Sequence, residues 1–204
     1  MSETESFFSS ATDRDDYIKN AVPVYKQVIN WALSSVSGRK PKRIVDIGCG
    51  LGHSTQLLNK HFGKSKIVGL DICPHAIAER IFNNDSIELN VGNVESLLKN
   101  RKLQSESFDF AFTSFFSSEF GGDDEYEYFE PLVADLQDLM KSGGTGLFVH
   151  NGPDCEDFLI GLGYDVDTPE TNKVLRPKRA EWKLFDCTEY GFVEFQLTPN
   201  DFYT

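Results

Sequence analysis

The chain has 204 residues, of which 32 are acidic and 20 are lysine or arginine, so its formal net charge at pH 7 is −12. This length suits one domain with a sizeable core, and hydrophobic residues make up 40% of the chain to fill it. The strong negative charge repels phosphate backbones, so general nucleic-acid binding is disfavoured.

Cysteine spacing and terminal composition exclude further classes. Cys49, Cys73, Cys155 and Cys187 are too scattered for a zinc site, and no Cys-x-x-Cys pair occurs, although their number alone does not exclude disulfides. The first residues, 1–6, are acidic and lack the apolar core of a signal peptide. No apolar run approaches the ~20 residues of a membrane span. We therefore expect a cytoplasmic protein, away from membranes and without a bound metal.

Apolar periodicity then gives the elements in chain order. Residues 1–15 are polar, and a helical pattern over 17–36 follows, which Pro23 should kink or divide into two pieces. Turn residues at 37–41 end this pattern. The predicted strands that follow are 43–48, 66–71, 86–91, 108–113 and 145–150, and the predicted helices between them are 53–61, 74–82, 94–101 and 125–141. Such an alternation predicts a parallel sheet with helices on both faces.

The carboxy-terminal part departs from this alternation of strands and helices. A short helix is predicted over 156–162, and two strands are predicted over 182–187 and 191–197. The three residues between these strands would form a tight hairpin loop. Residues 165–181 have no pattern that assigns them.

The stretch from Arg43 to Thr55 is the most informative, because a buried strand runs into three glycines and a helical pattern follows. Glycines let the backbone turn sharply and let a ligand come close. A helix start offers unpaired N–H groups to an anion. The dinucleotide fingerprint would need a glycine at His53. The pattern over 46–52 is instead Asp-x-Gly-x-Gly-x-Gly, which resembles the first motif of class I S-adenosylmethionine-dependent methyltransferases.

Two later strand ends carry matching chemistry. Asp71 ends the second predicted strand, 21 residues after Gly50, where a carboxylate can accept hydrogen bonds from both hydroxyls of a ribose. Other nucleotide-binding enzymes place an acid at the same position. The segment 91–95 is similar to the family's segment at the adenine edge, with Asn93 in place of the usual Asp. An amide both donates and accepts hydrogen bonds, so it can serve there.

The resemblance spans residues 43–150 and implies S-adenosyl-L-methionine as cofactor. It implies a three-layer, Rossmann-like α/β sandwich with a mostly parallel seven-stranded sheet and an antiparallel last strand. We expect one domain, with a helical cap over 1–40, a cofactor-binding core over 43–150, and a carboxy-terminal helix and hairpin over 151–204. The cofactor-binding residues that it implies are Tyr17, Asp46, Gly48, Cys49, Gly50, Gly52, His53, Ser54, Asp71, Ile72, Asn93, Val94 and Ser114.

The fourth predicted strand ends at Ser114-Phe-Phe-Ser117, in the segment where the family places the methionine part of the cofactor against the acceptor. Enzymes that methylate base amines usually carry Asn/Asp-Pro-Pro-aromatic there, so an amino-methylating nucleic-acid enzyme loses support. Lys141-Ser-Gly-Gly144 is similar to the Lys-Pro-Gly-Gly that commonly precedes the family's fifth strand.

Methyl transfer needs chiefly an in-line alignment in a closed, dry pocket, and a base only for a protonated or weakly acidic acceptor. The catalytic candidates are His150, which closes the fifth predicted strand, and Glu119. Asp154 and His53 are further candidate bases. A histidine in the position of His150 can equally be a hydrogen-bonded residue at a strand end.

Residues 115–130 lie beside the expected acceptor site and combine aromatic side chains with six carboxylates. This mixture suits a cationic small molecule such as an amine. The alternative is that the acids cap the helix over 125–141 and complement its dipole. Since the chain has no broad basic face, a small-molecule acceptor is favoured over nucleic acid.

Two other functions stay open. A tRNA- or protein-modifying methyltransferase would gather the basic residues of 176–183 with Lys19 and Lys26 on a common face. A methyltransferase-like fold could also bind the cofactor, or merely a nucleoside, without transferring a methyl group. The sequence identifies neither the acceptor atom nor the oligomeric state.

Overall fold

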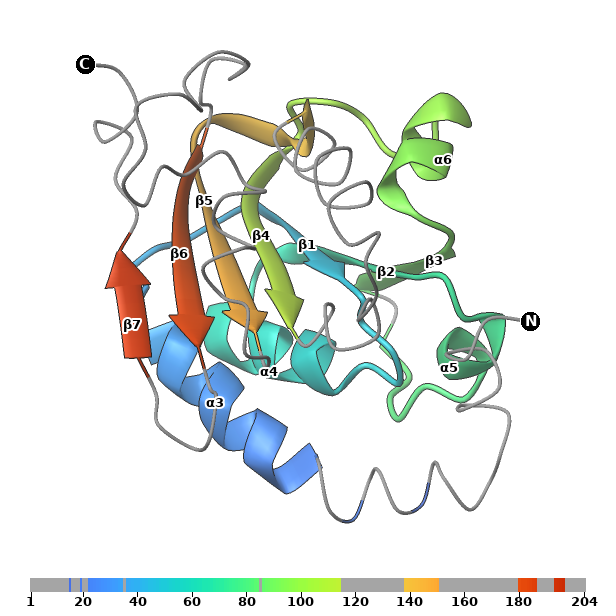
Figure 1. The fold of residues 1–204 in the computed structure, drawn as a ribbon. Coiled ribbons are helices and arrows are strands. Elements are labelled where there is room, and N and C mark those ends of the chain that lie inside the picture. The colour runs from blue at the N-terminus through green and yellow to red at the C-terminus, as the bar shows by residue number, and fades with distance from the viewer. Residues whose placement is uncertain are drawn as a thin grey trace, which may run out of the picture.

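The computed structural model describes residues 15, 19, 22–34, 36–84, 86–114, 138–150, 180–186 and 193–196. Its elements in chain order are α3 (Val22–Ser34), β1 (Arg43–Ile47), α4 (His53–Phe62), β2 (Lys66–Asp71), α5 (Pro74–Ala78), β3 (Ile87–Val91), α6 (Val94–Lys99), β4 (Phe108–Ser114), β5 (Met140–His150), β6 (Ala180–Asp186) and β7 (Val193–Gln196). Helices α3 and α4 lie next to each other and contact β5 and β2, respectively (Figure 1).

The strands form one sheet in the order β3-β2-β1-β4-β5-β6-β7. Neighbours from β3 to β6 pair in parallel, and β7 pairs antiparallel to β6 with Lys183 opposite Gln196. The Rossmann-like α/β fold with a parallel sheet is therefore confirmed. The strand order reverses between β1 and β4, and open sheets of this kind bind ligands outside the carboxyl ends of the strands at such a switch point.

The core between the sheet and helices α3 and α4 explains the apolar strands. Leu33 of α3 and Leu58 of α4 are buried against the sheet. The strand residues that they cover are Ile44, Ile67, Phe110, Phe112 and Leu147. Residues of alternate orientation, such as Val45 and Val68, are also buried. Both faces of the central strands are thus covered, as their near-continuous apolar sequence predicts, and each such side chain contributes about 1.5–3 kcal/mol.

Helix α3 begins at Val22, so Pro23 lies in its first turn. Proline is tolerated there because its missing N–H would have no partner within the helix. Within the described residues α3 continues from Val22 through Pro23 to Ser34, so Pro23 does not interrupt it. The helical piece that was predicted before Pro23 lies almost entirely outside the described residues.

The predicted boundary between the helix over 125–141 and the strand over 145–150 is wrong. Strand β5 already begins at Met140, which lies opposite Phe108, and the register then shifts so that Thr145 lies opposite Phe110. Residues 141–144 form the resulting bulge, with φ of 77° at Gly143. Met140 is fully buried, so pairing with β4 extends the strand through a glycine segment that reads locally as a turn.

Helix α5 is also shorter than the predicted helix over 74–82, since it ends at Ala78. After it, the Ile81 N–H donates to the Leu51 carbonyl at 3.0 Å. This bond directs the chain onto the turn that precedes α4 and prevents continuation of the helix. A contact between segments 30 residues apart overrides local helical periodicity here.

At the carboxy terminus, β6 covers 180–186 and β7 covers 193–196, whereas strands were predicted over 182–187 and 191–197. The predicted helix over 156–162, and residues 163–179, lie outside the described part of the chain. Among the helices that the structure describes, none has the length and apolarity needed to cross a bilayer.

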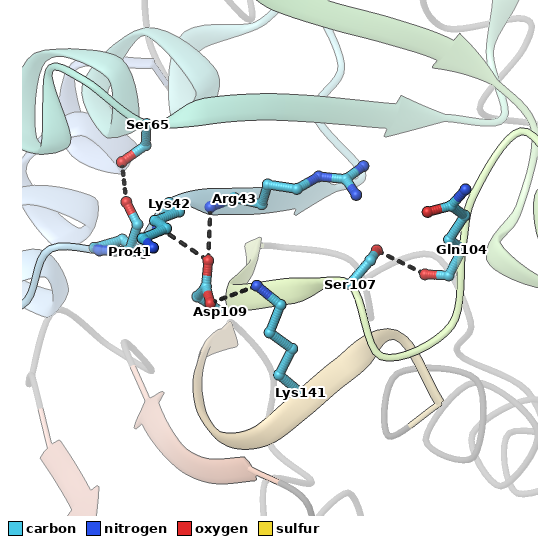
Figure 2. A network of polar contacts seen from close by, with 8 residues as sticks. All are labelled: Pro41, Lys42, Arg43, Ser65, Gln104, Ser107, Asp109 and Lys141. Atoms are coloured by element: carbon cyan, nitrogen blue, oxygen red, sulfur yellow. Dashed lines mark hydrogen bonds and ion pairs between the residues drawn. The ribbon is translucent and has the colours of Figure 1, made fainter.

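A polar network around Asp109 joins the amino ends of β1, β4 and β5 (Figure 2). Asp109 Oδ2 accepts the backbone N–H groups of Lys42 and Arg43 at 3.0 and 2.8 Å, and its Oδ1 accepts from Lys141 Nζ at 2.8 Å. Burial by itself raises the pKa of Asp109, but these hydrogen bonds and the Lys141 charge outweigh it, so the pKa lies below the ordinary 3.8. One carboxylate thereby fixes the bulge of β5 to the start of β1.

Replacing Asp109 with alanine should lower the free energy of unfolding by about 1–3 kcal/mol, because two backbone N–H groups lose their acceptor. Urea unfolding of the full chain at pH 7 measures this loss. The matched control is Glu95→Gln, which removes an exposed pair with Lys99 on α6 and should cost at most about 0.5 kcal/mol. Equal effects of the two substitutions would contradict the anchoring role of Asp109.

Candidate functional site

The turn between β1 and α4 is built on glycines with left-handed backbone conformations. Gly48, Gly50 and Gly52 have φ of 70°, 50° and 90°, which side chains with a Cβ rarely adopt. The Gly52 N–H donates to the Cys49 carbonyl at 2.8 Å, and the Cys49 N–H donates to the Leu70 carbonyl at 2.9 Å. The turn is thus closed on itself and fixed to β2, at the carboxyl edge of the sheet beside the switch point.

Asp46 lies at the end of β1 and is fully buried. Its Oδ2 accepts the hydroxyls of Ser54 at 2.8 Å and Thr55 at 2.6 Å, whereas its Oδ1 has no hydrogen-bond partner among the described residues. Burial raises the pKa of Asp46 from 3.8 to about 7; the two hydroxyls lower it and the Asp71 charge raises it. Asp46 and Ser54, both predicted to contact the cofactor, therefore bond to each other and fix the first turn of α4.

Asp71 connects three loops at the carboxyl edge of the sheet. Its Oδ2 accepts the Gly50 N–H at 2.7 Å, and its Oδ1 accepts the Cys73 N–H at 2.8 Å. Its backbone carbonyl accepts the Gly92 N–H at 2.8 Å. Asp71 is only 8% exposed, and a buried carboxylate requires such donors. The turn after β1 is therefore held to the loops that follow β2 and β3 through one residue.

Gly52 is required by packing as well as by its backbone angles. A Cβ placed on it would lie 2.2 Å from Cε1 of Phe82, so the aromatic ring rests on the glycine backbone. Phe82 follows α5, and no local pattern indicated its contact with the turn. Its only signal in the sequence is that it is an aromatic residue in a polar stretch.

The loops after β2 and β3 carry the remaining predicted residues. Asn93 is the N-cap of α6, where its side-chain oxygen accepts the Ser96 N–H at 2.9 Å. Val94, the first residue of α6, is buried. Ile72 and Val91 are large apolar side chains that are 43% and 42% exposed. Two exposed aliphatic side chains thus lie next to Asp71 and Asn93, since Ile72 follows Asp71 and Val91 is the last residue of β3.

Cys49 lies inside the turn with its side chain buried, and it is a free thiol. Burial, followed by the charges of Asp46 and Asp71, raises the pKa of the thiol well above its usual value. A Cβ on Gly69 of β2 would lie 3.0 Å from the Cys49 sulfur, so this sulfur packs over the glycine. The thiol is therefore a neutral packing group, and a ligand can meet Cys49 only through its backbone.

His53 is the first residue of α4, and both of its ring nitrogens are buried without a hydrogen-bond partner among the described residues. Burial, and next the charge of Lys26 on α3, lower the pKa of His53 from 6.5 to about 4. The imidazole is therefore neutral at physiological pH and offers one donor and one acceptor. The sequence placed His53 in the turn but gave no sign of Lys26 beside it.

Two other predicted residues, Ser114 and His150, lie at the same edge of the sheet, where the structure describes their backbone. Ser114 ends β4 opposite Val149, and His150 ends β5 opposite Asp186. Tyr17 and Glu119 lie outside the described residues, as does the whole segment 115–130. Within the part of the chain that the structure describes, no group of three or more His, Cys, Asp or Glu side chains could hold a metal ion.

Comparison with known proteins agrees with this geometry. Residues 39–151, more than half of the chain, match the model of a family described as a methyltransferase domain. A trans-aconitate 2-methyltransferase of Acidovorax sp. (strain JS42) is 54% identical over 39 residues, which are 19% of this chain and 15% of that protein. One of Methylobacterium nodulans is 37% identical over 65 residues, covering 32% of this chain and 25% of that protein. The chain thus matches only a small part of the length of these relatives.

Two solved structures share the fold. A putative S-adenosyl-L-methionine-dependent methyltransferase of Methanococcus maripaludis has a TM-score of 0.55 and 21% identity, covering 71% of this chain and 64% of that one. A putative methyltransferase of Haloferax volcanii, solved with the Trm112 methyltransferase activator, has a TM-score of 0.52 and 18% identity, covering 71% of this chain and 58% of that one. At these identities the likeness establishes the fold alone.

Substituting Gly52 with alanine should destabilise the protein more than substituting Gly38. Both glycines have φ of 90°, but a Cβ on Gly38 would meet nothing within 4 Å, so Gly38→Ala carries only the backbone strain of about 1–2 kcal/mol. Gly52→Ala adds the collision with Phe82. Urea unfolding compares the two variants, and the double variant with Phe82→Ala should recover part of the difference. Equal losses in both single variants would contradict the ring contact.

The raised pKa of Asp46 predicts a pH dependence of stability. In the folded chain Asp46 keeps its proton up to about pH 7, whereas its ordinary pKa is 3.8. The unfolded state therefore binds fewer protons between these values, and this contribution to stability is lost as pH rises from about 4 to about 7, at no more than about 1.4 kcal/mol per pH unit. Wild type should lose stability relative to Asp46→Asn over this range in urea unfolding. A constant difference would exclude the shift.

Proposed function

Because this chain belongs to the class I S-adenosylmethionine-dependent methyltransferases, we propose that it transfers a methyl group from S-adenosylmethionine to a small-molecule acceptor. The observation that carries the proposal is the carboxylate of Asp71, which is hydrogen-bonded to Gly50 of the glycine turn at the switch point of the sheet. This arrangement sets a ribose-binding acid beside a turn that a ligand can approach closely.

The described residues fit this cofactor. The turn is formed by glycines at positive φ, so no Cβ stands between its backbone and a ligand. Helix α4 begins at His53, and its N-cap Gly52 makes no side-chain cap hydrogen bond, so its first N–H groups have no acceptor within the helix and can donate to a polar or anionic group. We propose that the residues holding the cofactor are Tyr17, Asp46, Gly48, Cys49, Gly50, Gly52, His53, Ser54, Asp71, Ile72, Asn93, Val94 and Ser114, with Asp46 and Ser54 acting through the shape of the turn.

Bound S-adenosylmethionine supplies a methyl group that is already activated on a sulfonium sulfur. The residues of the chain have to hold and orient it and to exclude water. A carboxylate has about four acceptor sites, so Asp71 can accept ribose hydroxyls while it holds the turn. Asn93 uses its oxygen to cap α6, and its amide N–H groups can donate to adenine. Ile72 and Val91 offer apolar surface to the flat face of the base.

The acceptor is assigned to the small molecules because the short matching segments belong to proteins named trans-aconitate 2-methyltransferases. Two observations favour opposite charges for this acceptor. The carboxylates of 115–130 would favour a cation, whereas a relative of trans-aconitate would be an organic acid. We propose Glu119 and His150 as the bases for an acceptor that starts protonated.

We also infer that residues 1–204 form a single domain, in which the seven strands of the described residues make one sheet with β7 as its antiparallel end. Support comes from the register of β7 with β6. The segments that precede β1 and follow β4 are left to shape the acceptor site.

Incubation with S-adenosylmethionine labelled in its methyl group tests the function. The full chain is offered trans-aconitate and related organic acids, a panel of amines, tRNA and protein fractions in parallel. Label is expected in the organic acids or the amines. Label in tRNA or protein alone would replace the proposed acceptor class. Binding without transfer to any fraction would favour a fold that only holds the cofactor.

Substituting Asp71 with alanine should weaken binding of S-adenosylhomocysteine by roughly 2–4 kcal/mol, because charge-assisted hydrogen bonds to the ribose are lost and the Gly50 N–H loses its acceptor. Calorimetry on the full chain measures this affinity. Glu88→Ala on β3 is the control, since this side chain is exposed and pairs only with Asn90 among the contacts described. Unchanged affinity in Asp71→Ala would place the ribose elsewhere.

A further inference from the structure

The amino ends of the parallel strands form a surface with a charge opposite to that of the whole chain. Four segments reach this edge of the sheet: 36–43 at the start of β1, 63–66 at the start of β2, 100–109 at the start of β4, and 138–144 at the bulge of β5. They hold nine of the 20 lysine and arginine residues of the chain, but only three of its 32 acidic residues. No single stretch of the sequence shows this basic edge, because the fold collects its cations from separate segments.

The cations of the basic edge are mostly open to solvent. Seven of them are exposed, and two, Arg43 and Lys141, are half-buried. The exposed cations are Arg39, Lys40, Lys42, Lys64, Lys66, Arg101 and Lys102. Arg43 lies opposite Lys66 in the register of β1 with β2, and neighbouring strands are about 4.8 Å apart. Like charges at such a spacing repel each other, and an anion bound between them relieves this repulsion.

Arg43 is held in place by its neighbours at the centre of this edge. Its N–H donates to Asp109 Oδ2 at 2.8 Å, and its guanidinium lies 4.7 Å from the centre of the Phe108 ring. Figure 2 shows the side chain of Arg43 extending away from Asp109, whereas the ammonium of Lys141 reaches that carboxylate. The Arg43 Nε is buried without a hydrogen-bond partner among the described residues. A fixed guanidinium with unused donors suits a carboxylate, which it can bind with two parallel hydrogen bonds.

Helix dipoles explain only part of this charge. Helices α3, α4 and α6 each lead into a strand that starts at this edge, and cations are favoured near the carboxyl end of a helix. The effect is confined to the last turn of the helix, whereas Lys42, Arg43 and Lys66 lie at the starts of β1 and β2. The basic edge therefore has more positive charge than the helix ends require.

The size and composition of the edge favour an acidic peptide over nucleic acid. A nucleic-acid duplex carries one charge per about 1.7 Å of its axis, and the starts of β2, β1, β4 and β5 span only about 14 Å. A duplex would therefore extend over the rest of the chain, whose 29 acidic and 11 basic residues repel it. Single strands bind on exposed aromatic rings, but Phe108, the one aromatic residue of the four segments, is fully buried.

The basic edge is also separate from the cofactor site. Strand β1 runs from Arg43 at this edge to Ile47, which precedes the glycine turn, and its five residues span about 13 Å. Charges are screened over about 8 Å at physiological salt. The basic edge can therefore attract a partner without changing which acceptor the opposite edge selects.

We propose that the basic edge binds an acidic peptide segment of a partner protein, at the end of the sheet opposite the glycine turn. Carboxylates of the partner pair with the Arg43 guanidinium and with the exposed lysines beside it, Lys42, Lys64 and Lys66. This interaction rests neither on the proposed acceptor nor on methyl transfer.

Fluorescence anisotropy with a labelled decaglutamate peptide tests this surface in the full chain. The edge variant Lys64→Gln/Lys66→Gln removes two exposed cations of the basic edge. The control variant Lys19→Gln/Arg80→Gln removes two exposed cations outside the four segments and changes the net charge equally. Wild type should bind the peptide at 50 mM salt and more weakly at 200 mM salt. The edge variant should lose about three- to tenfold in affinity, and the control variant less than about twofold.

Carbodiimide coupling followed by mass spectrometry locates the contact, because this reagent joins carboxylates to lysines without a spacer. Links from the peptide are expected at Lys42, Lys64 and Lys66. Absence of peptide binding at 50 mM salt, links confined to lysines outside the four segments, or equal losses in the edge and control variants would overturn the proposal. If Lys64→Gln/Lys66→Gln does not fold, Lys40→Gln/Lys42→Gln gives the same comparison.

Two other occupants would also overturn the proposal. If tRNA or oligouridylate binds more tightly than the peptide at 150 mM salt, and loses affinity in the edge variant, the surface is a nucleic-acid site. If sedimentation without peptide shows oligomers of wild type but not of the edge variant, the occupant is a second copy of this chain. The affinity for S-adenosylhomocysteine should be the same in wild type and the edge variant, so failure here leaves the proposed function untouched.

Discussion

The organisation of the site depends on one buried carboxylate that accepts backbone N–H groups from two loops. Asp71 holds Gly50 on one oxygen and Cys73 on the other, and its own carbonyl holds Gly92. A charge that is 8% exposed is tolerable only with such donors. These hydrogen bonds fix the three loops that follow β1, β2 and β3 in one arrangement relative to one another. A ligand that spans ribose and base meets these loops as a single preformed surface.

The same device operates at the opposite edge of the sheet. Asp109 also accepts two backbone N–H groups, those of Lys42 and Arg43, and adds Lys141 from the bulge of β5. Strand ends and bulges leave N–H groups without ladder partners, and a carboxylate is the strongest acceptor for them. At the amino edge these bonds hold the strand ends together. At the carboxyl edge the same chemistry also shapes a place for a ligand, because the glycine turn leaves room there.

Charge is divided within the site. Burial, and to a smaller extent the charge of Asp71, raise the pKa of Asp46 to about 7, although hydrogen bonds from Thr55 and Ser54 lower it. On the α3 side, burial and then the charge of Lys26 lower the pKa of His53, whose ring nitrogens have no hydrogen-bond partner among the described residues.

Local periodicity determined the alternation of strands and helices, and the strand over 66–71 has the bounds that its apolar run predicts. The glycine spacing and Asp71 could also be recognised from the sequence, because each directly follows or ends an apolar strand pattern. Three features could not be read from the sequence: the bulge that starts β5 at Met140, the ring of Phe82 on Gly52, and the effect of the Lys26 charge on His53. These features depend on strand register, on burial and on contacts between distant segments. Register, burial and such contacts exist only after the chain has packed.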